Sequence, residues 1–223
     1  MGWIANTIFS SVGKKLIMAL TGLFLCTFLL VHLSGNLALF KHDGGEAFNH
    51  YSEFMSHNPL IRVMEIVMVL GFSLHMFNGV WLWFTNRFAR PVRYKKLPGS
   101  ETSSVFSRTM IFSAFLILAF LIIHLESFFV KQRMLATDSS MYDAVIHAFA
   151  NPYYSGFYIL ALILLGFHLN HGFSSAFQTL GLNHKKYTPL IKALGLLFSI
   201  LVPLGFATMP LYFGFFHICC GGN

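Results

Sequence analysis

The sequence is poor in charged residues, which make up only 10% of its 223 positions. A soluble domain carries roughly 25% charged residues, so this chain has too little polar surface to face water on every side. Hydrophobic residues make up 56% of it, and its 26 phenylalanines suit an exterior that contacts lipid. The composition therefore predicts an integral membrane protein.

Cysteine is also scarce, and the three cysteines exclude a disulfide framework. Cys26 lies within an apolar run, Cys219 and Cys220 are adjacent, and no spacing around them is typical of a zinc site. We expect none of the three to act in a site. The chain also lacks a GxGxxG fingerprint and a cysteine cluster for iron and sulfur, which excludes a flavin dinucleotide site or an iron–sulfur centre of its own.

Five long apolar runs are bounded by charged residues or by Pro and Gly, and each has the ~20 residues needed to cross a bilayer. They predict an all-α bundle of five transmembrane helices in a single domain, 1–223, at about 15–40, 60–84, 109–130, 153–180 and 189–216. The first run is too long for the apolar region of a signal peptide, and we expect it to be retained. Segments 45–55 and 140–150 predict two short helices between spans, each ended by an Asn-Pro pair.

The basic residues are distributed unevenly between the two sides of the predicted bundle. One side carries eleven of the 15: Lys14, Lys15, Arg87, Arg90, Arg93, Lys95, Lys96, Arg108, Lys185, Lys186 and Lys192. The positive-inside rule places that side, and with it the N-terminus, in the cytoplasm and the C-terminus outside. The net charge of +7 is thus a topology signal rather than a surface for nucleic acid.

Four histidines lie on four different apolar runs, and ionisable groups inside membrane spans are functional candidates by default. On the first and third helices, His32 and His124 lie about 13 and about 10 Å from the outer end, at ~1.5 Å per residue. On the second and fourth helices, His75 and His168 lie about 20 and about 24 Å from that end. Depth thus pairs His32 with His124 and His75 with His168, at levels roughly 10 Å apart.

Two facing imidazoles are what a six-coordinate haem iron needs inside a helix bundle. The pairs predict two stacked haems, with His32 and His124 on the outer iron and His75 and His168 on the inner iron. His171, three residues after His168, is an alternative ligand or a hydrogen-bond partner for a ligand or a haem propionate.

Glycines recur three or four residues from these histidines, at positions 35, 71, 79 and 172. On a helix such residues lie on the same face as the histidine. They either leave room for a flat macrocycle or allow close packing between helices.

The chain resembles the cytochrome b subunit of succinate dehydrogenase and fumarate reductase, in its five-helix, two-haem, single-polypeptide form. The similar stretches are "LVHLSGN" (30–36), "GEAFNHYSEFM" (45–55), "LHMFNGVWLWFTN" (74–86), "IIHLES" (122–127) and "GFYILALILLGFHLNHG" (156–172). The resemblance implies two haem b groups held by the same four histidines. His171 departs from the family pattern, since related chains tend to carry another residue there.

The resemblance also implies partners and a location in the bacterial inner membrane. An iron–sulfur subunit and a flavoprotein subunit would dock on the cytoplasmic face, at the basic loop 87–108 and near Lys185 and Lys186. Dicarboxylate chemistry would belong to those partners, and electrons would pass between them and a membrane quinone, menaquinone in preference to ubiquinone. Glu126, two residues past His124, is a candidate for proton transfer to that quinone.

Two other functions fit parts of the pattern. A di-haem subunit of a hydrogenase or formate dehydrogenase would need the same paired histidines. A transporter that uses histidines to relay protons or bind a metal should show broken helices or an internal repeat, and neither is evident in the sequence.

Overall fold

The computed structural model describes residues 2, 6, 9–89, 105–135 and 139–216, without the side chains of 105–109 and 133. Within this part the chain is helical and has no strand. Five of its helices are long and apolar enough to cross a membrane: α2 (Ser11–Asn36), α4 (Pro59–Phe88), α5 (Val105–Leu125), α7 (Pro152–Thr179) and α8 (Thr188–Leu211). The prediction of an all-α, multi-pass membrane protein is confirmed at this level.

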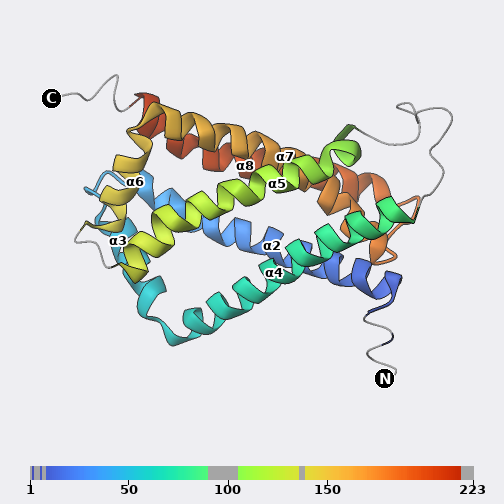
Figure 1. Ribbon diagram of the computed structural model, residues 1–223. Helices are drawn as coiled ribbons and strands as arrows, with labels where there is room; N and C mark the ends of the chain where they lie inside the picture. The colour runs from blue at the N-terminus through green and yellow to red at the C-terminus, as the bar shows by residue number, and fades with distance from the viewer. Residues whose placement is uncertain (1, 3–5, 7–8, 90–104, 136–138, 217–223) are drawn as a thin grey trace.

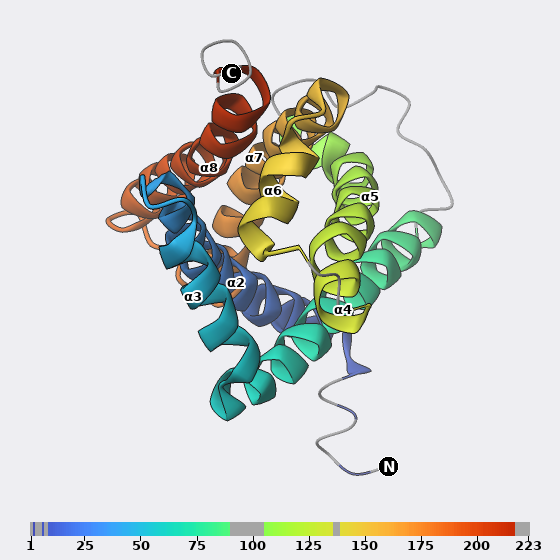
Figure 2. The same cartoon turned by 90° about the vertical axis from the view of Figure 1, so that its left-hand side faces the viewer.

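The two short helices lie across one end of the bundle (Figures 1 and 2). They are α3 (Glu46–His57) and α6 (Met141–Phe149), and both agree with the segments predicted from the sequence. We call this side of the molecule the α3/α6 end. Helix α2 begins at the opposite end and runs toward it, as Figure 1 shows.

Each short helix is followed by an Asn-Pro pair, and the next span begins at that pair. The side chain of Asn58 accepts a hydrogen bond from the backbone N–H of Leu60 at 2.9 Å, and Asn151 accepts one from Tyr153 at the same distance. The proline that follows each asparagine occupies the first helical turn, where its missing N–H costs nothing. Sequence and structure agree on these two boundaries because the cap is purely local.

Other boundaries differ from the predicted ones by about a turn. Helix α4 continues four residues past the predicted end at 84, because the polar residues that close its apolar run are still compatible with a helix. Three spans also change their winding near the α3/α6 end. Helix α2 tightens into η1 (Leu37–Phe40), whereas α5 and α8 widen into the π-helical segments η2 (Glu126–Met134) and η3 (Tyr212–Phe216).

Helices α2 and α7 each pack against several other spans. Helix α2 packs against α4 and α7, and α7 packs in turn against α5 and α8. The pairs α2 with α5 and α4 with α7 are not among the described helix pairs that pack closely along their backbones. The spans thus surround an interior across which α5 faces α2 and α4 faces α7 (Figure 2).

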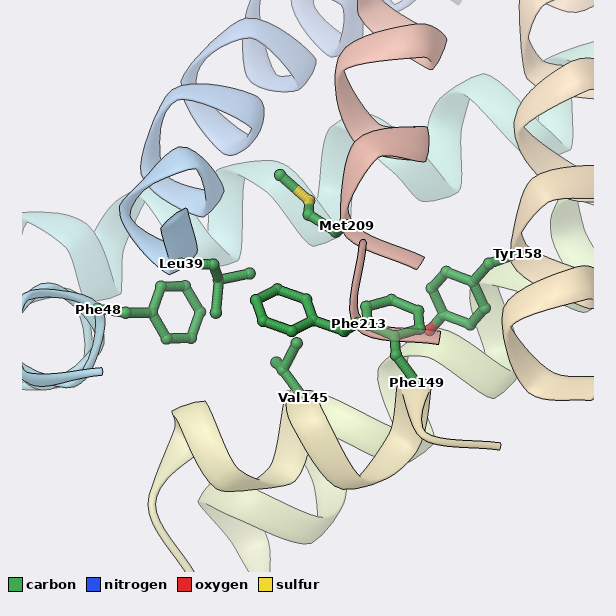
Figure 3. Packing of buried hydrophobic residues seen from close by; sticks show 7 residues of the cluster. All are labelled: Leu39, Phe48, Val145, Phe149, Tyr158, Met209 and Phe213. Carbon is green, nitrogen blue, oxygen red and sulfur yellow. The ribbon is translucent and has the colours of Figure 1, made fainter. Parts of the chain in front are cut away.

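The buried apolar cluster lies at the α3/α6 end, where the short helices meet the ends of α7 and α8 (Figure 3). Its members are Leu39, Phe48, Val145, Phe149, Tyr158, Met209 and Phe213. Along the spans themselves most large apolar side chains face outward, as expected for surfaces that contact lipid. In α4 the one buried residue is polar, Asn78, which is 8% exposed.

Candidate functional site: two histidine pairs

The four span histidines meet in two pairs inside the bundle. His32 of α2 faces His124 of α5 with ring centroids 5.9 Å apart, and His75 of α4 faces His168 of α7 with centroids 6.4 Å apart. All four side chains are half-buried. These are the two pairs predicted from the depth of each histidine along its helix.

Each pair connects helices whose backbones do not pack closely. His32 and His124 span from α2 to α5, and His75 and His168 span from α4 to α7. The close helix–helix contacts of the bundle lie elsewhere, between α2 and α4, α2 and α7, α5 and α7, and α7 and α8. The histidine side chains therefore meet across the interior, between helices whose backbones do not pack closely.

The distance between the two levels follows from contacts along α2 and α7. On α2, Thr21 contacts His75 and lies eleven residues before His32, a rise of ~16 Å. On α7, Tyr158 contacts His124 and lies ten residues before His168, a rise of ~15 Å. The two levels are therefore about 15 Å apart along the helix axes, further than the roughly 10 Å expected from the span ends.

Phenylalanines hold the rings of the pair nearer the α3/α6 end. Phe28 stacks on His32 at 5.2 Å and Phe120 stacks on His124 at 5.7 Å, each from four residues earlier on the same helix. Phe206 of α8 also contacts His32, with centroids 5.5 Å apart. Residues four apart share a helix face, so the repeated Phe-x3-His spacing supports both imidazoles in the same way.

Thr21 favours the tautomer of His75 that carries its proton on Nδ1. The hydroxyl of Thr21 donates to the carbonyl of Ile17 at 2.7 Å, and its oxygen lies 3.2 Å from Nδ1 of His75. Because the single hydroxyl proton is used by the carbonyl, the oxygen accepts the Nδ1–H of the imidazole. The Nε2 lone pair of His75 is then free for another partner. Gly22 makes room for this ring, since a Cβ there would lie 3.2 Å from its Cε1.

His124 has a similar hydroxyl partner in Tyr158. The phenol oxygen of Tyr158 lies 3.1 Å from Nδ1 of His124, and 2.9 Å from the phenol oxygen of Tyr154. A proton on Nδ1 is consistent with this chain when Tyr158 accepts from His124 and donates to Tyr154. The arrangement leaves Nε2 of His124 free as well.

His32 and His168, the other members of the two pairs, have no hydroxyl partner at Nδ1 in the described part of the chain. Nδ1 of His32 lies 3.4 Å from the amide nitrogen of Asn36, which also donates to the carbonyl of His32 at 2.7 Å. Nδ1 of His168 is buried and has no hydrogen-bond partner among the described residues. A buried polar atom without a partner costs about 1–3 kcal/mol, which indicates that the chain alone does not complete the surroundings of this ring.

The pairs fit a shared metal ion. An imidazole nitrogen binds a transition metal at about 2 Å and the ring centre lies about 1 Å further, so two imidazoles on opposite sides of one ion have centroids about 6 Å apart. Contacting aromatic rings have similar spacings, so the distance fits a metal without requiring one. No group of three or more His, Cys, Asp or Glu in the described part of the chain is arranged to hold a metal ion. A metal between two imidazoles would thus need its remaining ligands from a prosthetic group such as haem.

The structure shows which of the glycines near the histidines allow close packing between helices and which have open space beside them. A Cβ at Gly71 would lie 3.0 Å from Phe24, and one at Gly79 would lie 3.3 Å from Met18, both on α2. Gly35 faces the side chain of Tyr51 in α3. These three therefore serve close packing between helices. A Cβ at Gly172 would meet nothing within 4 Å, so this glycine has open space beside its helix.

The remaining predicted site residues lie apart from the pairs. His168, rather than His171, is the α7 ring in contact with His75, although both are half-buried. Glu126 begins η2, is exposed, and forms an ion pair with Lys131 at 3.0 Å. Cys26 is half-buried and free, whereas Cys219 and Cys220 lie outside the described residues.

The basic loop predicted to dock partner subunits is described only at its edges. Residues 90–104 of the loop 87–108 lie outside the described part. At that end of the bundle the guanidinium of Arg87 lies 5.7 Å from the ring centre of Trp83, and the ammonium of Lys14 lies 4.9 Å from that of Trp81. Such cation–π contacts suit residues at a membrane–water interface.

Sequence reasoning missed the polar partners of the histidines. Thr21, Asn36 and Tyr158 are polar residues inside apolar spans, and each contacts a histidine. A search for hydroxyl and amide groups at the depth of each predicted ligand would have found them. Comparisons of the chain with protein-family models, curated proteins and solved structures found no match.

Proposed function

We propose that the chain is the di-haem cytochrome b subunit of a succinate:quinone oxidoreductase, that is, of a succinate dehydrogenase or fumarate reductase. The observation that carries the proposal is the pair of facing imidazoles at each of two levels, 5.9 and 6.4 Å apart by centroid, in a chain with five apolar helices. The sequence resemblance, whose quoted stretches lie in four of the five spans and in the segment 45–55, favours this complex among respiratory enzymes.

The residues that would hold the two haem b groups are those of the two pairs. His32 and His124 would bind one iron near the α3/α6 end, and His75 and His168 the other. Bound haem would supply one-electron transfer through the bundle. The chain itself orients the imidazoles, through Thr21 on His75 and Tyr158 on His124, and its apolar spans keep water away from both levels.

The proposed partners are a membrane quinone and two soluble subunits. An iron–sulfur subunit and a flavoprotein subunit would bind at the end opposite α3 and α6, which is cytoplasmic by the distribution of basic residues in a bacterial inner membrane. The quinone, menaquinone by the resemblance, would react near the outer pair. Glu126 is our candidate for its proton exchange, because it is exposed at that end two residues after His124.

The same geometry suits a di-haem subunit of a hydrogenase or formate dehydrogenase, which the partner proteins would reveal. A transporter that binds a metal ion through protein ligands alone is less well supported. Such a site usually needs three or more protein ligands, and the described residues provide no such group.

The test is to express the full chain in membranes, purify it in mild detergent and measure haem per polypeptide with a reduced-minus-oxidised spectrum. Two low-spin b-type haems per chain are expected. A chain without haem would overturn the proposal. Affinity purification from native membranes separates the remaining candidates, since an iron–sulfur subunit and a succinate-oxidising flavoprotein should co-purify, whereas hydrogenase or formate dehydrogenase subunits would refute the assignment to this complex.

A further inference from the structure

We infer that Tyr158, held by Tyr154, is a positioning residue for His124 and sets the reduction potential of the outer haem centre. The inference rests on the proposed function, because it assigns a task to a residue that touches a proposed ligand rather than the haem itself. It concerns a hydrogen bond that the structure shows between two side chains of α5 and α7.

Tyr158 is held rigidly in the apolar cluster of the α3/α6 end (Figure 3). Its side chain is 5% exposed, and its ring makes edge-to-face contacts with Phe120 at 4.8 Å and Phe149 at 5.0 Å. Phe120 also stacks on His124, so the same phenylalanine supports both members of the hydrogen bond. The phenol oxygen therefore stays in one place relative to the imidazole.

The direction of the hydrogen-bond chain and the tautomer of His124 depend on each other. If Tyr158 donated to Nδ1, the imidazole proton would lie on Nε2 and would block binding to a metal. If Tyr158 donates to Tyr154, it accepts the Nδ1–H and leaves the Nε2 lone pair available. Only the second arrangement is compatible with His124 as a ligand, and Tyr154 at 2.9 Å is the acceptor that permits it.

In the outer pair the hydroxyl of Tyr158 accepts from Nδ1 of His124. In the inner pair the hydroxyl of Thr21 accepts from Nδ1 of His75. Across the outer pair, Nδ1 of His32 has no hydroxyl partner of this kind among the described residues: the amide nitrogen of Asn36 lies 3.4 Å away and donates to the carbonyl of His32 at 2.7 Å. The two hydroxyl acceptors differ in chemistry, since Thr21 gives its proton to a backbone carbonyl and Tyr158 has a second phenol for its own. The outer centre can therefore be altered at Tyr158 without changing the inner one.

An acceptor on Nδ1–H makes the opposite nitrogen a stronger electron donor. A stronger donor stabilises the more positive, oxidised iron and lowers the reduction potential. Removing the acceptor should raise it. Only the difference in the strength of this bond between the two oxidation states shifts the potential. Its net contribution of about 0.5–1.5 kcal/mol therefore sets an upper limit of roughly 65 mV for one electron, a twelvefold change in the oxidised-to-reduced ratio.

The experiment is a spectroelectrochemical titration of the purified haem-loaded protein, with electron paramagnetic resonance of the oxidised form. Tyr158→Phe keeps the packed ring and removes the hydroxyl. It should retain two haems, raise one of the two potentials by up to roughly 65 mV, and alter the resonance of that centre alone. Thr21→Val should shift the other potential, which identifies the centres. Tyr153→Phe is the matched control, because Tyr153 is 87% exposed on the same helix.

The outcomes separate this inference from the proposed function. A wild-type protein without haem refutes the proposed function. A wild-type protein with two haems whose Tyr158→Phe variant shows both potentials and both resonances unchanged refutes the role of Tyr158. A shift in the same centre with Tyr153→Phe would show a nonspecific effect of the helix and would also overturn the inference. Tyr154→Phe should shift the outer potential in the same direction as Tyr158→Phe but by less.

Discussion

Replacing His168 or His171 by leucine distinguishes the two candidate ligands on α7. The two residues are three positions apart, so sequence spacing places them on neighbouring parts of one helix face. The structure separates them, because His168 is the ring that lies 6.4 Å from His75. We therefore expect His168→Leu to lose one haem centre and His171→Leu to keep both.

The size of the effect follows from the separation of the levels. The two pairs lie about 15 Å apart along α2 and α7, and they share no side chain. Removing one imidazole should therefore leave the other pair intact, and the haem content should fall from two to one per chain. The α-band absorbance of the reduced protein should fall by about half, while His171→Leu should match the wild type.

The assay combines haem extraction with the reduced-minus-oxidised spectrum of each variant, purified at equal protein concentration. Leucine keeps the span apolar, and intact insertion is checked from the yield in the membrane fraction. Loss of a centre in His171→Leu, with both centres kept in His168→Leu, would reverse the assignment of the ligand. Loss of both centres in a well-inserted His168→Leu protein would refute the independence of the two levels.

Three further predictions concern stability, measured as the free energy of unfolding in mixed micelles. Ser155→Ala removes a fully buried hydroxyl that donates to the carbonyl of Phe149 at 2.8 Å, and it should cost about 1–3 kcal/mol; a change near zero would show that the carbonyl finds another donor. Gly166→Ala would place a Cβ 3.0 Å from a backbone carbonyl of α8 and should destabilise the α7–α8 contact, whereas Gly156→Ala, with open space around it, should not; equal effects would contradict this. Burial raises the pKa of the Tyr142 phenol, so the fold favours its neutral form, and the resulting stability should be complete below pH ~10 and fall as pH rises through the folded-state pKa. Tyr142→Phe should flatten that alkaline decline, and an unchanged slope would refute the assignment.

The spans and the pairing of the histidines were predictable because both depend on position along the helix axis. A run of apolar residues defines a span, and a fixed rise per residue converts sequence distance into depth. Two histidines at the same depth on facing helices can then meet, as His32 and His124 do. The short helices were predictable for a related reason, since their Asn-Pro boundaries act within a few residues.

The direction in which a side chain points around the helix axis was not predictable in the same way. The depth of Thr21 and Tyr158 can be counted along the chain, but the neighbouring helix that each one faces depends on tertiary packing. The same limit applies to Gly71 and Gly79, which face side chains of α2 and not the interior of the bundle. The π-helical η2 was also missed, because a wide turn has no simple signature in hydrophobic spacing.

The position of the apolar core explains why the histidines matter to the architecture. Within lipid there is no hydrophobic driving force between spans, so helices associate there through small residues and polar contacts. The buried cluster accordingly lies at the α3/α6 end, where short helices and span ends pack together (Figure 3). Deeper in the bundle α5 and α4 each pack closely against a single span, α7 and α2 respectively. The histidine pairs are contacts across this interior, so the same four side chains that would bind the haems also connect the two sides of the bundle.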